Sequence, residues 1–469
     1  MGEQVFDVVF IGGGPAGYQG AIRAAQLGMK VAVVESRELG GVCLNRGCIP
    51  TKAIRASVEV LSRARRAKAY GIEIETARPD IKAIIARKNK VVGLLRGGIS
   101  QLFRSRSIEH LEGTGTLLSP REVEVETANG IIRLKAGKIV IATGSRPSIP
   151  SPFTGLTGEN KGVLTTDDIL EVSRVPASLL IVGAGAVGVE MASIMAELGS
   201  SVTLLEMKDR ILPGEDLEMA SYMTRMLKRQ KVKVLTGLSV NEAAVGDKVT
   251  VMLSNGQKWE GDAVLMAAGR VPNVESIGLR AVGLAENGRP LAVNEHMETG
   301  ISGIFAAGDV VGGWLLAHVA FAEGITAAEN AAGLTSRMDY RVVPRCVFAF
   351  PEYAAVGLSE EEAKEQFPAT AFSFPFKSLG MAQALGEWEG MVKLVVHEKN
   401  GQILGGHVIG PHAADLVAEI ALAMRHQIPA KGIVDTIHTH PTLSEAVLET
   451  AQAACGQAIH MLPGEHTNK

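Results

Sequence analysis

One sequence unit occurs twice in this chain of 469 residues, and its repetition limits the folds that the chain can adopt. Each copy consists of an apolar run, three glycines spaced as G-x-G-x-x-G, an alanine-rich stretch, and a second apolar run that ends in a glutamate. The shared positions recur 171 residues apart: Gly12, Gly14, Gly17, Gly28 and Glu35 reappear as Gly183, Gly185, Gly188, Gly199 and Glu206.

The unit has the parts of a dinucleotide-binding βαβ fold. Its first glycine permits a tight turn, its second lets a pyrophosphate approach the backbone at the positive end of a helix, and its third lets helix and strand pack closely. The glutamate accepts hydrogen bonds from ribose hydroxyls. Such glycines alone often mark an ordinary turn, but strand, helix, second strand and acid together are strong evidence. Two copies therefore predict two bound dinucleotides.

A second feature is the cysteine pair Cys43 and Cys48. Glycines flank it, at Gly40, Gly41 and Gly47. Five residues of regular helix would separate the two Cα atoms by about 7.5 Å, beyond the limit of about 7 Å for a disulfide. Pro50 removes a helical hydrogen bond and favours a distorted turn. If the cysteines pair, the strained geometry indicates a labile redox disulfide.

Two other interpretations of these cysteines stay open. In a chain with four cysteines and no recognisable secretory signal, each can be a buried apolar residue. The pair can also be half of a zinc site, but this needs a second cluster at ligand spacing. Cys346 and Cys455 are solitary, so we predict no metal site.

The stretch 40–52, Gly-Gly-x-Cys-Leu-Asn-x-Gly-Cys-Ile-Pro-x-Lys, resembles the redox disulfide motif of the flavoprotein pyridine nucleotide-disulfide oxidoreductases. It is most similar to the motif of members that oxidise dihydrolipoamide, although they usually have serine where this chain has Thr51. The resemblance covers nearly the whole chain, with further signatures at 138–144, 268–273, 304–309 and 438–445.

The resemblance implies an α/β fold with two Rossmann-like dinucleotide-binding domains, for FAD and for NAD, and a C-terminal α+β dimerisation domain. The predicted boundaries are 1–150 for the FAD domain, 151–275 for the NAD domain, 276–344 for a return to the FAD domain and 345–469 for the dimerisation domain. Locally, the pattern predicts two long helices over 53–103, a small antiparallel meander over 108–140 with a hairpin at Asn129-Gly130, and a buried strand over 138–144.

The surroundings of each copy indicate which cofactor it binds. The first copy, continuous with the cysteines, should hold FAD. Glu206 favours NAD in the second copy, because its carboxylate would repel the 2′-phosphate of NADP. Lys208 and Arg210 oppose this interpretation, but we expect them to be solvated charges at a strand end. The resemblance adds Gly144, in a flavin-domain signature, and Gly269, in the signature that closes the NAD domain. It also adds Asp309, which contacts the ribityl chain or caps the next helix.

The C-terminal stretch His438-Thr-His440 to Glu445 matches the motif that supplies the active-site base of the family, with His440 as base and Glu445 as its orienting carboxylate. A dithiol substrate needs a base because only the thiolate attacks a disulfide, and a thiol titrates near about 8.5. An imidazole titrating near about 6.5 can accept and return that proton. His438, His412 and His407 are interpreted as surface or capping residues.

The resemblance also implies the remaining roles. Cys43 would be the sulfur attacked by the substrate, and Cys48 the thiolate that faces the flavin. Lys52 would pair with Glu190 beside the isoalloxazine. The expected protein is a homodimer, and its substrate is the lipoyl arm of a carrier in a 2-oxoacid dehydrogenase or glycine-cleavage complex. No lipoyl segment is recognisable in the chain, so we expect the carrier to be a separate protein.

Composition excludes other classes of partner. The formal net charge is −3 and no basic cluster occurs, so neither nucleic acid nor an anionic membrane is expected. No apolar run is long enough to span a bilayer. The start of the chain lacks a charged segment followed by an apolar run and a cleavage site, which predicts a cytoplasmic location.

The same motifs are compatible with other functions. A glutathione-type reductase would need basic residues where Glu206 stands, and a mercuric reductase would have a C-terminal cysteine pair. A diaphorase needs flavin but not the cysteines, and a purely structural subunit needs neither. Family members commonly have an arginine after Phe-Pro-Phe, whereas this chain has Lys-Ser-Leu-Gly-Met381. The sequence does not determine whether this difference alters the entrance for the lipoyl substrate.

Overall fold

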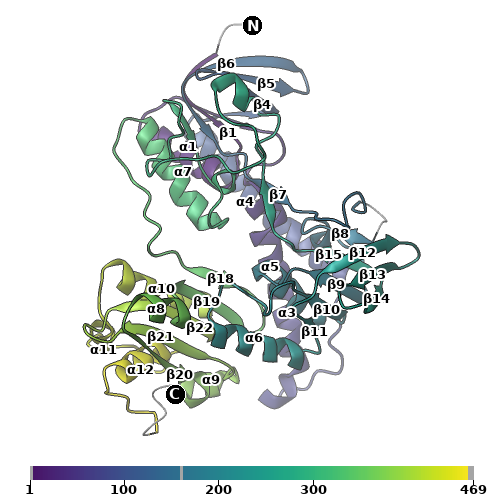
Figure 1. Ribbon diagram of the computed structural model, residues 1–469, viewed down its shortest axis with the longest axis vertical. Coiled ribbons are helices and arrows are strands. Elements are labelled where there is room, and N and C mark those ends of the chain that lie inside the picture. The colour runs from purple at the N-terminus through teal and green to yellow at the C-terminus, as the bar shows by residue number, and fades with distance from the viewer. Residues whose placement is uncertain (1–3, 159–161, 463–469) are drawn as a thin grey trace. The chain divides into compact units, whose positions relative to one another are not determined.

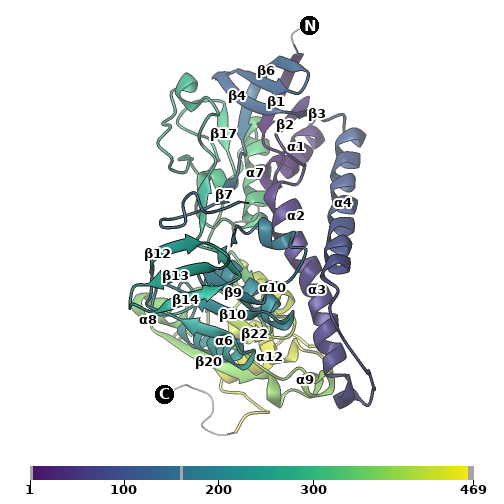
Figure 2. The same ribbon diagram turned by 90° about the vertical axis from the view of Figure 1, so that its right-hand side faces the viewer.

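The computed structural model describes residues 4–158 and 162–462 (Figures 1 and 2). The first three residues, on which the predicted location partly rests, lie outside the described part. The chain forms two compact units. The first consists of Met1–Ser148, Thr165–Arg174 and Gly269–Asp339, and the second of Ile149–Leu164, Val175–Ala268 and Tyr340–Lys469.

The first unit is built on a seven-stranded sheet with the order β3-β2-β1-β6-β5-β4, in which β17 pairs with β6. Strands β1, β2, β3, β6 and β17 run parallel, whereas β4, β5 and β6 form an antiparallel meander. The strands are β1 (Gln4–Ile11), β2 (Val31–Glu35), β3 (Glu109–Glu112), β4 (Thr114–Ser119), β5 (Glu122–Thr127), β6 (Gly130–Ile141) and β17 (Ile304–Ala306).

Both faces of the parallel strands are buried, as a near-continuous apolar run requires. In β1, Val8 and Phe10 pack in one core cluster, while Val9 and Ile11 pack in another on the opposite face. Helices α1 and α7 lie side by side over the first of these faces (Figure 1). The helices of this unit are α1 (Pro15–Gln26), α2 (Gly41–Arg46), α3 (Cys48–Arg65), α4 (Ile81–Ser105) and α7 (Ala317–Ala331).

The two predicted long helices are confirmed as α3 and α4, which run alongside one another (Figure 2). The hairpin at Asn129-Gly130 is also confirmed, because Thr127 pairs with Gly130. The predicted limits of the meander are wrong. Strand β3 joins the parallel sheet beside β2, and 130–141 forms one 12-residue strand rather than a meander strand followed by a separate strand.

Gly137 gives a physical reason for this continuous strand. A Cβ atom at this position would lie 2.8 Å from the carbonyl oxygen of Asp7, so only glycine lets β6 approach β1 there. Strand β6 can therefore pair with β5 on one side and with β1 on the other. A pattern of residues along one strand does not show this approach.

Two short strands pair where the chain leaves and re-enters the first unit. Strand β7 (Ser145–Pro147) is antiparallel to β16 (Arg270–Pro272), with Arg270 opposite Pro147. The remaining short elements of the unit are the 3₁₀ turns η1 (Ala67–Tyr70), η2 (Asp168–Leu170), η3 (Leu279–Val282) and η4 (Asp309–Val311).

The second unit contains a parallel sheet with the order β11-β10-β9-β15-β8 and an antiparallel sheet β12-β13-β14. Its first parallel pair, β9 and β10, is joined by α5, as in the first unit. The elements are β8 (Val163–Leu164), β9 (Ser178–Val182), α5 (Ala186–Glu197), β10 (Ser201–Leu205), α6 (Leu217–Arg229), β11 (Lys233–Leu235), β12 (Val240–Val245), β13 (Val249–Leu253), β14 (Lys258–Gly261) and β15 (Ala263–Met266).

The C-terminal part of this unit is a five-stranded antiparallel sheet with the order β18-β19-β22-β21-β20. Helices α10 and α12 bury apolar side chains against it. The elements are β18 (Arg345–Val347), β19 (Glu352–Gly357), α8 (Glu360–Gln366), β20 (Ala369–Pro375), η5 (Phe376–Ser378), α9 (Gly380–Leu385), β21 (Met391–His397), β22 (Ile403–Gly410), α10 (Ala413–Arg425), α11 (Ala430–Val434) and α12 (Glu445–Ala454). Met381, in α9, packs against this core.

Candidate active site

The glycines of the first copy occupy a tight strand-to-helix turn. A Cβ atom on Gly12 would lie 2.2 Å from the carbonyl oxygen of Ala142, and one on Gly17 would lie 1.8 Å from that of Gly12. These two glycines are therefore required by packing within the chain. A Cβ atom on Gly14 would meet only the Cα of Gly41, at 3.8 Å. The chain itself has no need of a glycine there, which fits a backbone kept bare for a pyrophosphate.

The second copy repeats this arrangement. A Cβ atom on Gly183 would lie 2.4 Å from the carbonyl oxygen of Ala267, and one on Gly188 would lie 1.9 Å from that of Gly183. Nothing lies within 4 Å of the corresponding position on Gly185. In both copies the middle glycine alone is unexplained by the protein's own packing, so the residues present fit two dinucleotides.

The two acids also have matching partners. Glu35 accepts from the backbone N–H groups of Gly13 and Arg37, at 2.7 and 2.8 Å. Glu206 accepts from those of Ala184 and Lys208, at 2.7 and 2.9 Å. Two N–H groups leave lone pairs on each carboxylate for ribose hydroxyls. Lys208 is exposed as expected, whereas Arg210 is half-buried, so the prediction of a fully solvated charge is wrong there.

Three side chains, including the predicted ribityl contact Asp309, connect the paired strands β7 and β16 of the first unit. Ser145 donates to Oδ2 of Asp309 at 2.5 Å and accepts from Nε of Arg270 at 2.7 Å. Arg270 also donates to the carbonyl oxygen of Ser145 at 2.8 Å. Gly144 and Gly269, which precede these strands, both have positive φ, at 70° and 99°.

Asp309 therefore has a different local role from helix capping. Gly308 is the residue that precedes η4, and no side chain caps this turn, so the expectation that Asp309 caps a helix is wrong. Its Oδ1 has no hydrogen-bond partner in the described chain, and this oxygen fits a flavin-chain hydroxyl. Sequence reasoning missed Ser145 and Arg270 as its partners, although both lie in or beside the signatures already noted.

The cysteines lie on two helices that meet at Gly47. Helix α2 carries Cys43 and ends at Arg46, and α3 begins at Cys48, so the predicted interruption between the cysteines is confirmed. The break lies at Gly47 (φ −145°, ψ −107°), and Pro50 falls in the first turn of α3, where a helix needs no N–H from it.

The structure describes Cys43 and Cys48 as two thiols. The pKa of Cys43 is raised well above its ordinary value, first because its thiol hydrogen-bonds to Cys48 and then because it is buried. The positive charge of Lys52 opposes this increase. Cys43 therefore keeps its proton, and the structure brings Cys43, Cys48 and Lys52, three of the predicted residues, together.

Glu190 lies in α5 and is buried, at 6% exposed. Its carboxylate accepts from the backbone N–H of Phe348 at 2.8 Å, within the second unit. The pairing of Glu190 with Lys52 stays a prediction.

The predicted base pair is assembled at the start of α12. Nδ1 of His440 lies 2.8 Å from Oε1 of Glu445, whose Oε2 accepts from the backbone N–H of Thr442 at 2.8 Å. Burial raises the pKa of Glu445, but the bonds from Thr442 and His440 outweigh it and hold the pKa below its ordinary value. An ionised Glu445 fixes the proton on Nδ1, which leaves Nε2 as the basic nitrogen.

The rest of the imidazole is accessible. The His440 side chain is 78% exposed, and its Nε2 has no partner in the described chain. His438 differs, because its side chain is 5% exposed and Nε2 lies 2.8 Å from Glu419. His412 pairs loosely with Asp415 at 3.5 Å, and His407 is fully buried. The interpretation of His438 and His407 as surface residues is wrong.

Residues 4–158 and 162–462 contain no group of three or more His, Cys, Asp or Glu side chains that could hold a metal ion. Within the same ranges, no helix has the length and apolar character to cross a membrane.

Comparison with known proteins places these features in a family. Residues 6–324 match the model for pyridine nucleotide-disulphide oxidoreductases, and residues 343–451 match the dimerisation domain of the same family. Dihydrolipoyl dehydrogenase from Chlamydia pneumoniae is 41% identical over 462 residues, with 98% of this chain and 99% of the relative covered. The enzyme of that name from Bacillus subtilis is 40% identical, with 97% and 99% covered.

Solved structures agree with this result. The crystal structure of LpdA from Mycobacterium tuberculosis has a TM-score of 0.89 and 28% identity, covering 96% of this chain and 99% of its own. The HOCl-induced flavoprotein disulfide reductase RclA from Escherichia coli has a TM-score of 0.86 and 28% identity, with 95% and 99% covered. The chain therefore belongs to the pyridine nucleotide-disulphide oxidoreductases, a family of enzymes that use FAD and NAD(H).

Proposed function

We propose that the protein is a dihydrolipoamide dehydrogenase, which oxidises a protein-bound lipoyl dithiol and reduces NAD. The relatives of that name match it over nearly the full length of both chains. The observation that carries the proposal is the His440–Glu445 pair, which offers an accessible Nε2 as a base in a chain that also holds two thiols hydrogen-bonded to each other. A dithiol substrate needs this base, whereas simple dye reduction does not.

The chemistry follows from thiol–disulfide exchange. His440 removes a proton from one substrate thiol, and the thiolate attacks Cys43 of the enzyme disulfide, so the sulfur of Cys48 leaves as a thiolate. His440 releases this proton to solvent and then removes the proton of the second substrate thiol. The second thiolate attacks the substrate sulfur bound to Cys43, which closes the substrate disulfide, and Cys43 leaves and takes the proton from His440. The substrate thereby loses two electrons and two protons. One proton is on Cys43, the other is released to solvent, and the enzyme holds the electron pair as the Cys43 thiol and the Cys48 thiolate.

The residues around the pair favour this product state. The raised pKa of Cys43 keeps the released sulfur protonated, and the Cys43 thiol donates a hydrogen bond that stabilises Cys48 as a thiolate. When bound, FAD would accept the electron pair from the two cysteines, and NAD would carry it away as hydride. Gly14, Glu35 and Asp309 would hold FAD, and Gly185 and Glu206 would hold NAD.

Membership of the family supports a proposal for the assembly. Residues 343–451 match its dimerisation domain. We expect a homodimer in which His440 acts on the disulfide of the partner chain, and a lipoyl carrier of a 2-oxoacid dehydrogenase or glycine-cleavage complex as substrate. The division into four domains and the cytoplasmic location stay predictions.

The proposal is tested by an anaerobic assay of NAD reduction with dihydrolipoamide and, in parallel, with reduced glutathione. We expect turnover with dihydrolipoamide only. Turnover with glutathione alone, or a preference for NADP, would favour a glutathione-type reductase instead. His440→Gln serves as the control variant, because it should lose dithiol oxidation while it still reduces artificial dyes with NADH.

A further inference from the structure

The chain after each ribose-binding acid returns to the same position of the glycine loop. In the first copy, Gly13 donates through its N–H to Glu35, and its carbonyl oxygen accepts from the N–H of Gly40 at 2.8 Å. In the second copy, Ala184 donates to Glu206, and its carbonyl oxygen accepts from the N–H of Leu212 at 2.8 Å. In each copy, the residue between the first two glycines is thus held by hydrogen bonds at both its N–H group and its carbonyl oxygen.

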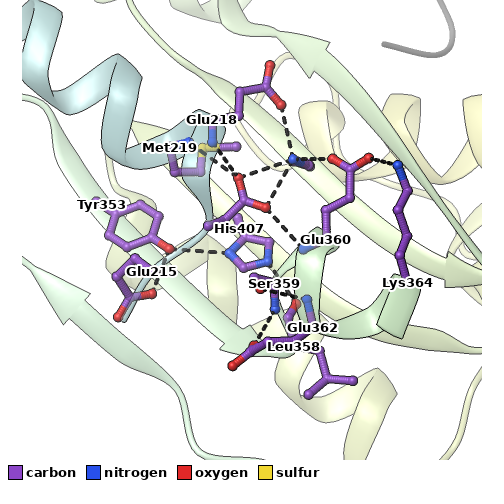
Figure 3. A network of polar contacts seen from close by, with 12 residues as sticks. Glu215, Glu218, Met219, Tyr353, Leu358, Ser359, Glu360, Glu362, Lys364 and His407 are labelled. Atoms are coloured by element: carbon purple, nitrogen blue, oxygen red, sulfur yellow. Dashed lines mark hydrogen bonds and ion pairs between the residues drawn. The ribbon is translucent and has the colours of Figure 1, made fainter. Parts of the chain in front are cut away.

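The two returning segments lead to different places. In the first copy, the chain passes from Gly40 directly into α2 and so delivers Cys43. In the second, it passes from Leu212 to Glu215 and Asp216, which enter a buried polar cluster on the C-terminal sheet (Figure 3). The position that carries the redox cysteine in one copy therefore carries an anchor in the other.

Asp216 is the buried half of this anchor, with no exposed surface. Its carboxylate accepts from the backbone N–H of Glu218 at 3.1 Å, at the start of α6, and from that of Glu360 at 3.2 Å, at the start of α8. Oδ2 also lies 3.0 Å from Nζ of Lys393, in β21. The Asp216 side chain therefore caps α6, which follows the second glycine copy, and also contacts α8 and β21 of the C-terminal part.

Glu215 supplies the other half. It accepts from Nε of Arg345 at 2.8 Å and from the hydroxyl of Tyr353 at 2.8 Å. Tyr353 is 1% exposed, and Figure 3 shows its hydroxyl directed at both Glu215 and His407. The pKa of Tyr353 is raised well above its ordinary value, first by burial and then by the charge of Glu215, so its hydroxyl keeps the proton that it donates.

We propose that Glu215 and Asp216 are positioning residues for the pyridine nucleotide, because they fix the segment that holds Leu212 against Ala184. The inference rests on the proposed assignment of NAD to the second copy. A segment fixed at both ends is already ordered before binding, so the nucleotide does not bear the cost of ordering it. Loosening the anchor should therefore weaken nucleotide binding without a change at any residue that touches the nucleotide.

Two tyrosines provide a matched pair for the experiment. Tyr353 donates to Glu215 at 2.8 Å, and Tyr222 donates to Glu389 at 3.0 Å. Both bonds join the nucleotide-binding part to the C-terminal part, but only the first involves the segment between Glu206 and α6. Tyr222→Phe and Tyr353→Phe thus remove the same chemical group from two places.

The test measures binding of NAD and of ADP-ribose to the FAD-loaded protein by titration calorimetry. We expect Tyr353→Phe and Asp216→Asn to weaken both ligands by about threefold to tenfold, which corresponds to the net contribution of one hydrogen bond. In Asp216→Asn the amide oxygen can still cap α6, whereas the charge that pairs with the C-terminal part is removed. ADP-ribose lacks the nicotinamide, so an equal loss with both ligands locates the effect at Ala184 and Glu206. Tyr222→Phe should bind both ligands as the parent does.

The outcomes are distinct. If Tyr353→Phe and Asp216→Asn bind both ligands with the parent's affinity, or if Tyr222→Phe loses as much affinity as they do, the positioning role is wrong. Anaerobic reduction of the flavin by dihydrolipoamide should proceed at the parent's rate in all three variants, and loss of this half-reaction in the two anchor variants would also contradict it. A parent protein that does not bind NAD would instead contradict the proposed function itself.

Discussion

Nζ of Lys393 lies 3.0 Å from Oδ2 of Asp216, and the two side chains are 2% and 0% exposed. The same ammonium group lies 2.7 Å from Glu360 and 3.1 Å from Glu218. Burial lowers the pKa of Lys393, but Asp216 and the neighbouring glutamates raise it by more, so that its pKa is above the ordinary value. The pair is therefore a buried salt bridge in the charged form.

Removing the ammonium group should destabilise the protein strongly. Lys393→Met would leave Asp216 buried and unpaired, which typically costs about 3–5 kcal/mol. Lys364→Met is the control, because Lys364 pairs with Glu360 at the exposed edge of the same cluster and should cost less than about 1 kcal/mol. Urea unfolding of both variants measures the difference, and equal destabilisation would show that the buried pair contributes no more than the exposed one.

Stability should fall in mild acid because of His407. Burial lowers its pKa from 6.5 to about 4, although Asp216 opposes the shift; Arg345 and Lys393 add to it. Between these values the unfolded chain binds a proton that the folded chain does not. The free energy of unfolding should therefore decrease by about 3 kcal/mol as the pH falls from 6.5 to 4.

The control for this effect is His407→Gln, which retains a donor for the carbonyl oxygen of Leu358 but does not titrate. Its stability should be less than the parent's at pH 7 and should decrease less steeply below pH 6.5. If the free energy of unfolding of the two proteins changed with pH in parallel, other groups would be responsible for the acid sensitivity.

The sulfur nearest the flavin is predicted to be Cys48. Because the pKa of Cys43 is raised, Cys43 should stay protonated in the two-electron-reduced protein. The thiolate should therefore be on Cys48 and should give a long-wavelength charge-transfer band. Cys48→Ser should abolish the band while FAD stays bound, and Cys43→Ser should keep it. Anaerobic absorption spectra decide this, and a band that survives in Cys48→Ser would reverse the assignment.

Cofactor preference should depend on Glu206. Glu206 is 7% exposed, and its carboxylate accepts from two backbone N–H groups, so it is held in place to repel a 2′-phosphate. The parent should prefer NAD over NADP, and Glu206→Ala should narrow the ratio of the two kcat/KM values. An unmodified protein that favours NADP would contradict this prediction.

Each active site is predicted to use two chains. His440 belongs to the second unit and the cysteines to the first, and the family resemblance assigns the base to the partner's disulfide. Coexpressing Cys43→Ser and His440→Ala chains with different tags yields a mixed dimer in which one site has both lesions and the other has neither. The mixed dimer should recover about half of the parent's activity. One that is no more active than its parent variants would place base and disulfide on one chain.

The local units of this protein could be predicted from its sequence. The glycine spacing and the terminal acids of both βαβ copies are confirmed in detail, because tight turns and close helix–strand packing depend on residues near in the chain. The cysteine pair and the His440–Glu445 pair, five residues apart in each case, were predicted for the same reason. Their roles additionally needed the family resemblance.

Contacts between residues distant in sequence could not be predicted and are known from the three-dimensional structure. Arg270 reaches Ser145 across 125 positions of sequence, and Lys393 reaches Asp216 across 177. A buried lysine, a buried histidine or a half-buried arginine has no periodicity that distinguishes it from a surface residue. Its charge is acceptable only because partners from other strands supply hydrogen bonds, and those partners are defined by the packing of the sheets rather than by neighbouring residues.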